Sequence, residues 1–304
     1  MRLANGFTAI SNILAAYFII SAWKGWLPFP GFLVLSTICF YYGGMVLNDF
    51  FDQSRDALER PERPIPRGRI SSRAAGLMGF YLLLCGWIFA AFQGIASATV
   101  AGLLALSILV YNRILKEGLS GSLMMGLCRY LNWFLGISFL FNATSSLQGI
   151  QSGLLLGHVP QVLQTILLIP VPIFLYVFSL TILSKEETEA RRRWPLYVSI
   201  SGLFLCAASV IVLYDAEVLR GWWGLVALAS GLIYLIYRLF ALSRDFRSGT
   251  IQSIIKMMVL GIIPLDALLV LSAGTDWMES VLAAGAVLLL LWPARALSGR
   301  FAVT

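Results

Sequence analysis

The sequence predicts an all-α polytopic membrane protein, and three observations lead to this fold class. Hydrophobic residues make up 59% of the 304 residues and charged residues only 12%, with a mean hydropathy of +0.83. The apolar residues gather in runs of about 20, the length that an α-helix needs to cross a bilayer. The Lys and Arg residues fall in short segments between these runs. A water-soluble domain of this composition would have a mostly apolar surface, so the chain requires a bilayer.

Nine to ten of these runs are predicted to span the membrane. They cover residues 7–26, 31–50, 74–93, 95–112, 120–141, 164–183, 196–214, 221–240, 253–273 and 279–297. The last two could instead form one span plus a re-entrant or surface segment. The first run follows a single arginine and lacks an Ala-x-Ala-like cleavage site, so we interpret it as a retained helix and not a signal peptide.

The basic residues orient the spans. With the N-terminus inside, all of the 22 Lys and Arg residues except Lys24, Arg220 and Arg129 lie in cytoplasmic segments or at the adjoining span ends. This distribution satisfies the positive-inside rule. It predicts an integral protein of a bacterial inner membrane with a cytoplasmic N-terminus. The net charge of +7 does not indicate a nucleic-acid partner, because the basic residues form no single face.

The positions of the cysteines and of the single histidine argue against disulfides, a zinc site and a Ser-His-Asp triad. All four cysteines lie inside apolar runs, so we expect small core residues and no disulfide. His158 lies in a neutral loop without a partner cluster, which excludes a zinc site and a Ser-His-Asp triad.

Acidic residues gather after the second and the sixth predicted spans. The first cluster is Asp49, Asp52, Asp56, Glu59 and Glu62, and the second is Glu186, Glu187 and Glu189. Both clusters would emerge on the cytoplasmic side, four spans apart. We therefore predict a single domain, 1–304, with two similar halves of about 31–141 and 164–273, although no sequence repeat is evident.

The first cluster has the chemistry of a metal and phosphate site. Asp49, Asp52 and Asp56 follow helical spacing, so a continuing helix would place their carboxylates on one face. Hard cations prefer oxygen ligands, and Mg²⁺ commonly joins carboxylates to substrate phosphates. The alternative, that the aspartates only solvate a helix end, is disfavoured because acids at a helix C-terminus oppose its dipole. The prolines of the following RPERPIPRGRIS would fold its arginines back over the site.

NDFFDQSRD followed by RPERPIPRGRIS resembles the first aspartate-rich motif of the UbiA superfamily of intramembrane prenyltransferases. YNRILK, after the fourth span, resembles that family's Tyr-…-Leu-Lys signature. The resemblance implies a bundle of nine to ten transmembrane helices around a central cavity. It also implies a Mg²⁺-dependent transfer of an isoprenyl group from an allylic isoprenyl diphosphate, taken from the bilayer, to an aromatic or lipid acceptor. The sequence does not identify that acceptor.

The same resemblance assigns roles to individual residues. Asp49, Asp52 and Asp56 would bind the metal and, with Lys116, serve catalysis. Substrate binding would fall to Asn48, Arg63, Arg67 and Tyr111. The two arginines fit equally well as positive-inside anchors, and Tyr111 as an interfacial aromatic residue.

The second loop, LSKEETEARRR, departs from the family, which has a second aspartate-rich motif there. Glu186, Glu187 and Glu189 are able to bind Mg²⁺, or they belong to a solvated loop with topogenic arginines. Lys185 could instead neutralise the diphosphate directly. The divergence is similar to that of the EboC-like branch. It leaves open a catalytically divergent protein that binds or transports an isoprenoid.

Three further polar residues lie deep in apolar runs. Arg129 and Asn132 are one turn apart in the fifth span, where they would line the cavity or form an inter-helix bond. Asp266 lies mid-span and could pair with Arg129 or with Lys256. A secondary transporter predicts such charges at the midplane of both halves. Only Arg129 and Asp266 match this expectation for a transporter. The two acidic clusters lie at the cytoplasmic edge instead, so we favour the prenyltransferase.

Overall fold

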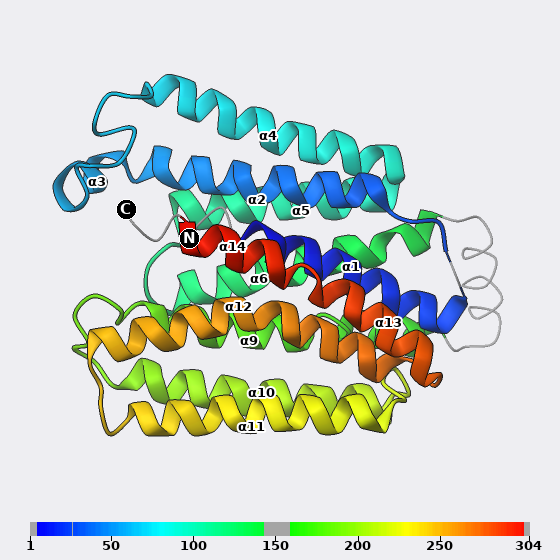
Figure 1. Ribbon diagram of the computed structural model, residues 1–304. Coiled ribbons are helices and arrows are strands. Elements are labelled where there is room, and N and C mark those ends of the chain that lie inside the picture. Colours follow the sequence, from blue (N-terminus) through cyan, green and yellow to red (C-terminus); the bar gives the residue numbers. More distant parts are fainter. Residues whose placement is uncertain (1–4, 26, 143–158, 301–304) are drawn as a thin grey trace.

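The computed structural model describes residues 5–25, 27–142 and 159–300, and these residues form a bundle of long helices (Figure 1). The first half contains α1 (Gly6–Lys24), α2 (Gly31–Phe51), α3 (Gln53–Glu59), α4 (Ser72–Gln93), α5 (Ile95–Arg113), α6 (Gly118–Ser138) and the 3₁₀ turn η1 (Phe139–Asn142). The second contains α8 (Val159–Leu168), α9 (Val171–Ser184), α10 (Trp194–Asp215), α11 (Trp222–Leu242), α12 (Ser248–Ala273), α13 (Trp277–Leu288) and α14 (Leu291–Arg300). The predicted all-α membrane fold is confirmed.

Ten segments of the described chain are long and apolar enough to cross a membrane, and each coincides with a predicted span. The last of them, Trp277–Leu297, has 21 residues and is long enough to cross a membrane, which favours ten spans over nine. Two spans are interrupted helices. The sixth divides into α8 and α9 at Pro170, because a proline interrupts the helical hydrogen-bond ladder. The tenth divides between α13 and α14, just before Pro293. His158 lies outside the described residues.

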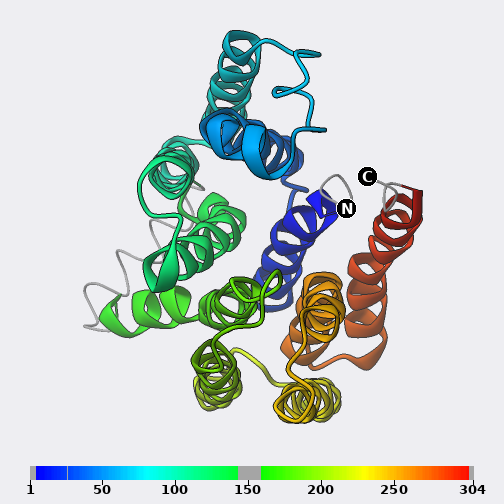
Figure 2. The same cartoon turned by 90° about the vertical axis from the view of Figure 1, so that its left-hand side faces the viewer.

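The helices surround α1. This helix packs against α2, α6 and α12, and Figure 2 shows it enclosed by its neighbours. α4 packs on the outside of α2 and α5, while α10 and α11 pack outside α9 and α12. The four cysteines lie in these helices as free thiols. The chain segments that carry the two acidic clusters, after α2 and after α9, lie at the same end of the bundle (Figure 1).

Small residues allow the helices to approach closely, as is typical where lipid removes the hydrophobic drive between helices. A Cβ atom added to Gly79 of α4 would lie 2.6 Å from Leu47 Cγ of α2. One added to Gly136 of α6 would lie 2.7 Å from Ala16 Cβ of α1. These contacts set the positions of α1, α2 and α6, whose inner faces form most of the site described next.

Candidate active site

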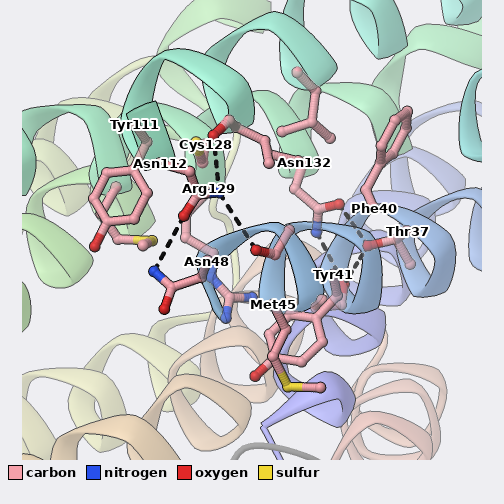
Figure 3. Close-up of a pocket in the computed structure, with 15 residues that line it drawn as sticks. Thr37, Phe40, Tyr41, Met45, Asn48, Tyr111, Asn112, Cys128, Arg129 and Asn132 are labelled. Atoms are coloured by element: carbon pink, nitrogen blue, oxygen red, sulfur yellow. Dashed lines mark hydrogen bonds between the residues drawn. The ribbon is translucent and has the colours of Figure 1, made fainter. Parts of the chain in front are cut away.

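A cavity of about 280 Å³ opens between α1, α2, α5 and α6 (Figure 3). Four of the predicted substrate-binding residues, Asn48, Tyr111, Arg129 and Asn132, line it. Asn48 and Tyr111 belong to the helix ends next to the charged loops, and Arg129 and Asn132 lie deeper along α6. Apolar side chains such as Phe40, Leu104 and Met125 complete the wall. The cavity therefore joins a polar mouth to a second polar region inside the membrane.

The first acidic cluster begins directly after Asn48 of this cavity, and Asp49 and Asp56 line a separate, smaller pocket with Arg63. α2 ends at Phe51 and α3 begins at Gln53, yet the backbone bonds from Asp52 to Asn48 O (3.0 Å) and from Asp56 to Asp52 O (2.8 Å) continue the helical pattern. Asp49 and Asp56 consequently face the same side, because both carboxylates contact one guanidinium. Asp52 pairs instead with Lys116, so the structure brings two of the three predicted carboxylates together and not all three.

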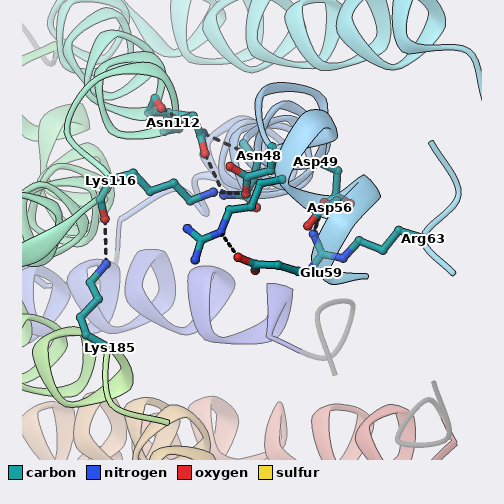
Figure 4. A network of polar contacts seen from close by, with 12 residues as sticks. Asn48, Asp49, Asp56, Glu59, Arg63, Asn112, Lys116 and Lys185 are labelled. Carbon is teal, nitrogen blue, oxygen red and sulfur yellow. Dashed lines mark hydrogen bonds and ion pairs between the residues drawn. The ribbon is translucent and has the colours of Figure 1, made fainter. Parts of the chain in front are cut away.

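The arginine-rich segment folds back over these carboxylates, as predicted. Arg63 Nη1 donates to Asp49 Oδ1 at 3.2 Å and to Asp56 Oδ2 at 2.5 Å (Figure 4). Arg67 differs: its side chain is exposed, and the bond found for it in the described chain joins its backbone N–H to Arg63 O. The turn therefore brings Arg63, and not Arg67, against the aspartates.

Two lysines connect the chain segments that follow α2, α5 and α9. Lys116 Nζ forms an ion pair with Asp52 Oδ2. Lys185 Nζ donates to the backbone oxygen of Lys116 at 2.7 Å (Figure 4). Burial lowers the pKa of Lys185, and the neighbouring positive charge of Lys116 lowers it further. Lys185 of the second loop thus contacts the backbone of Lys116, whose ammonium group pairs with Asp52 of the first cluster.

Asn112 is a site residue that the sequence reasoning missed. Its Oδ1 accepts a bond from Asn48 Nδ2 at 3.1 Å, and its Nδ2 donates to the backbone oxygens of Ile108 and Gly44. It holds the amide of Asn48 at the cavity mouth. The available signal was its position directly after Tyr111 in YNRILK.

The glutamates of the second loop do not form the metal site expected of them. Glu186 is buried, and its Oε2 accepts the backbone N–H groups of Arg191 (2.8 Å) and Arg192 (2.9 Å). Glu189 pairs with Arg191 at an exposed position. Across the described residues, no three Asp, Glu, His or Cys side chains gather as a ready metal site. Glu186 satisfies the turn of its own loop, so this part of the prediction is corrected.

The donor chemistry of the first cluster does fit Mg²⁺. Asp49, Asp52 and Asp56 offer only oxygen ligands, and a phosphate-bound Mg²⁺ needs one or two carboxylates from the protein. All three carboxylates are already neutralised by a cation, Arg63 or Lys116. The cluster therefore requires positive charge, and a metal ion could share or replace the charge that these side chains supply.

The deep polar residues form one network, with partners other than those predicted. The carboxylate of Asp266 accepts bonds from Ser11 Oγ (2.6 Å), Asn12 Nδ2 (2.8 Å) and Trp133 Nε1 (3.0 Å). Asn12 Oδ1 in turn accepts from Arg129 at 3.3 Å. Asp266 forms no direct ion pair with Arg129, since Asn12 bridges the two side chains, although their charges interact across it. Lys256, the other predicted partner, lies on an exposed face of α12. The polar residues of the first apolar run were the overlooked signal.

Fold and site together define an integral membrane protein of the all-α kind, with paired acidic and basic side chains at the end of a helix that lines an intramembrane cavity. The sequence profile of the UbiA prenyltransferase family matches residues 9–193. The chain belongs to that family. Its assignment to the EboC-like branch stays a prediction.

Curated relatives with similar sequences are digeranylgeranylglyceryl phosphate synthases. That of Sulfurisphaera tokodaii is 31% identical over 140 residues, which are 45% of this chain and 49% of the relative. That of Sulfolobus acidocaldarius is 30% identical over 198 residues, 64% of each chain. The chain thus spans about half to two thirds of the length of these relatives.

Solved structures share the fold. One, described as structural and mechanistic insights into a digeranylgeranylglyceryl phosphate synthase in membranes, has a TM-score of 0.62 at 18% identity, covering 90% of this chain and 98% of the other. The apo structure of a UbiA homolog from Aeropyrum pernix K1 has a TM-score of 0.64 at 16% identity, covering 86% and 94%. A UbiA homolog from Archaeoglobus fulgidus bound to DMAPP and Mg²⁺ has a TM-score of 0.45 at 14% identity, covering 97% of each chain.

Proposed function

We propose that this protein is a Mg²⁺-dependent intramembrane prenyltransferase that moves an isoprenyl group from an allylic diphosphate to a small aromatic or lipid acceptor. One observation carries the proposal. Arg63 pairs with Asp49 and Asp56, and Lys116 pairs with Asp52, at the end of the helix whose Asn48 lines a cavity within the membrane-spanning helices. Carboxylates for a metal and cations for phosphate oxygens are the groups that an isoprenyl diphosphate requires.

The reaction breaks the allylic C–O bond, and the diphosphate leaves with the bonding electrons. The prenyl carbon then bonds to the acceptor, which releases a proton. Bound Mg²⁺ would neutralise the leaving diphosphate, and Asp49, Asp52 and Asp56 would hold the metal. Lys116 and Arg63 stand where they would bind phosphate oxygens once the carboxylates turn to the metal. The apolar wall of the cavity would exclude water from the reactive prenyl group.

The supporting residues take further roles in this proposal. Asn48, held by Asn112, and Tyr111 would line the path from the diphosphate to the acceptor. Lys185 would supply charge beside Lys116, where the family has acidic residues. Arg67 would join the diphosphate only if the exposed turn closes on it.

We further propose that the site faces the cytoplasm and that one domain is built from halves of about 31–141 and 164–273. The positive-inside distribution supports the sidedness, because both charged loops lie at one end of the bundle (Figure 1). The names of the relatives above support a lipid among the acceptors. The bacterial inner membrane stays a prediction.

The test uses the full chain in lipid nanodiscs with Mg²⁺, geranyl diphosphate and a lipid extract, and measures pyrophosphate release. The wild type should release pyrophosphate, and Asp52→Asn should lower the rate at least a hundredfold, because Lys116 and the metal lose their shared ligand. Asp245→Asn, which alters an exposed aspartate paired with Arg247, is the matched control and should retain the rate. Equal rates for all three proteins would refute the assignment of the site.

A second candidate is a protein that binds an isoprenoid diphosphate without transferring it. The use of Glu186 by its own loop favours this alternative, because the second loop then offers fewer metal ligands. Tight Mg²⁺-dependent binding of geranyl diphosphate without pyrophosphate release, under every acceptor condition, would select it over the transferase.

A further inference from the structure

A second cavity, of about 210 Å³, lies between α9, α11 and α12, apart from the candidate active site. The described residues that line it are leucines, glycines, tyrosines, one methionine and one proline. Both tyrosine hydroxyl groups have partners: that of Tyr176 donates to Met258 O at 2.9 Å, and that of Tyr234 accepts from Arg238 Nη1 at 2.8 Å. Because these hydroxyl groups are bonded, the cavity suits a hydrocarbon chain and not water.

A glycine leaves this cavity open at the side of the bundle. Among the described residues, a Cβ added to Gly231 of α11 would meet only Leu268 Cδ1 within 4 Å, at 3.9 Å, so the space beside this helix is unfilled. Gly231 and Tyr234, which is 52% exposed, lie on the outer face of α11, and α11 packs outside α12. The cavity is therefore a groove that opens toward the lipid around the helices.

The wall that α12 contributes follows one face of that helix. It consists of Met257, Gly261, Pro264 and Leu268, and steps of three and four residues keep to one side of a helix. These four residues extend about 16 Å along the helix axis. The groove is too small for another helix, which is about 10 Å wide with its side chains, but it suits a single alkyl chain.

Arg238 supplies a positive charge at one end of the groove. It lies one turn beyond Tyr234, toward the end of α11 at Leu242, and its Cζ lies 5.8 Å from the ring centre of Tyr234. This ring contact and the hydrogen bond to the hydroxyl group hold the guanidinium beside the groove. The ion pairs of the described chain do not include Arg238. Its charge and most of its five N–H donors are therefore available to an anion.

We propose that this groove binds an anionic membrane phospholipid, with one acyl chain along α12 and the phosphate group at Arg238. The end of α11 that carries Arg238 lies at the same end of the bundle as the two charged loops (Figure 1). In the proposed topology this end meets the cytoplasmic leaflet, whose anionic lipids are attracted to basic groups between transmembrane helices.

The groove does not have the chemistry of the proposed diphosphate site. A Mg²⁺-bound diphosphate requires carboxylate ligands, and the described residues that line the groove include none. One guanidinium matches the single negative charge of a phospholipid phosphate instead. The lipid site is thus separate from the proposed function, and its occupation should not depend on Mg²⁺.

The test is native mass spectrometry of the full chain in detergent with equimolar dioleoyl phosphatidylglycerol and dioleoyl phosphatidylcholine, which share their acyl chains and differ in net charge. The wild type should retain phosphatidylglycerol at least tenfold more than phosphatidylcholine, with or without EDTA. Arg238→Gln should retain the two lipids equally. Arg73→Gln, which removes an exposed arginine from the first turn of α4, is the matched control and should keep the preference.

Gly231→Leu fills the groove and should release the lipid, because the acyl chain loses its space. Gly285→Leu in α13 is its control, since a Cβ there meets nothing within 4 Å, and this variant should keep the lipid. Phosphatidylglycerol with a photoactivatable acyl chain gives a second measurement on the wild type, which does not depend on the folding of Gly231→Leu. Its cross-links should map to residues 228–235 of α11 and 257–268 of α12.

Four results would overturn the inference: equal retention of both lipids by the wild type, a preference that persists in Arg238→Gln, a lipid that persists in folded Gly231→Leu, or cross-links confined to other helices. Farnesyl diphosphate and inorganic phosphate, added as competitors, test other sources of the anion. Neither should displace phosphatidylglycerol at equal concentration. Displacement by the first would assign the groove to an isoprenyl diphosphate, and displacement by the second would leave an anion site without a chain; either result would refute the phospholipid.

Discussion

At the scale of single residues, Arg63 joins two carboxylates that would otherwise repel each other. Its side chain is 15% exposed and that of Asp56 only 6%. Removing one partner of a buried ion pair leaves an uncompensated charge, which typically costs about 3–5 kcal/mol. The same guanidinium is the one that would meet a diphosphate, so stability and substrate binding depend on one side chain.

Arg63→Met should therefore lower the free energy of unfolding by about 3 kcal/mol in metal-free buffer. Chemical unfolding in mixed micelles measures the change. Arg67→Met, which removes an exposed arginine of the same turn, should stay within about 0.5 kcal/mol of wild type. Added Mg²⁺ should restore part of the loss in Arg63→Met, because the metal would replace the missing cation. Equal stability of the two variants would show that Arg63 does not neutralise the cluster.

At the scale of helices, the contact between α1 and α6 holds the cavity and the polar network in register. From α6, Arg129 donates to Thr8 and Asn12 of α1, and Asn132 donates to the backbone oxygen of Ala9. Ser11 and Asn12 of α1 and Trp133 of α6 each donate to Asp266 of α12. Gly136 permits the close approach: an added Cβ would also lie 3.2 Å from Ile13 Cα, a backbone atom that cannot rotate away. The distance between the two helices thus decides whether the network forms.

Gly136→Ala should separate the helices and destabilise the fold by about 1–3 kcal/mol, the usual cost of overpacking. Gly285→Ala in α13 is the control, since a Cβ there meets nothing within 4 Å. It should be neutral or slightly stabilising, because Ala favours a helix over Gly. If Gly136→Ala left the stability unchanged, the interface between α1 and α6 would have enough space for a methyl group, and the close approach would not depend on glycine.

At the scale of the whole molecule, the positive-inside distribution predicts that the end of the bundle with the two charged loops faces the cytoplasm. Arg60 follows α3, next to the aspartate cluster, and Asp276 caps the start of α13. The two residues lie at opposite ends of the bundle. Arg60→Cys should react with a membrane-impermeant maleimide only after the membrane is opened, and Asp276→Cys should react in intact cells. The four native cysteines lie within the helices and give the background. The reverse pattern would invert the proposed topology.

The sequence by itself determined the all-α membrane fold, nine to ten spans and the first aspartate motif. These features follow from local hydropathy, charge and spacing along neighbouring residues. It also predicted that Arg129 and Asn132 line the cavity or bond another helix, because polar residues in an apolar run avoid lipid, and the structure shows both. Only the tertiary structure decided that Arg63, and not Arg67, contacts the aspartates, that Glu186 serves its own loop, and that Asn12 stands between Arg129 and Asp266. Those outcomes depend on how a turn closes and on which helices meet, and such contacts between distant residues leave no local pattern to read.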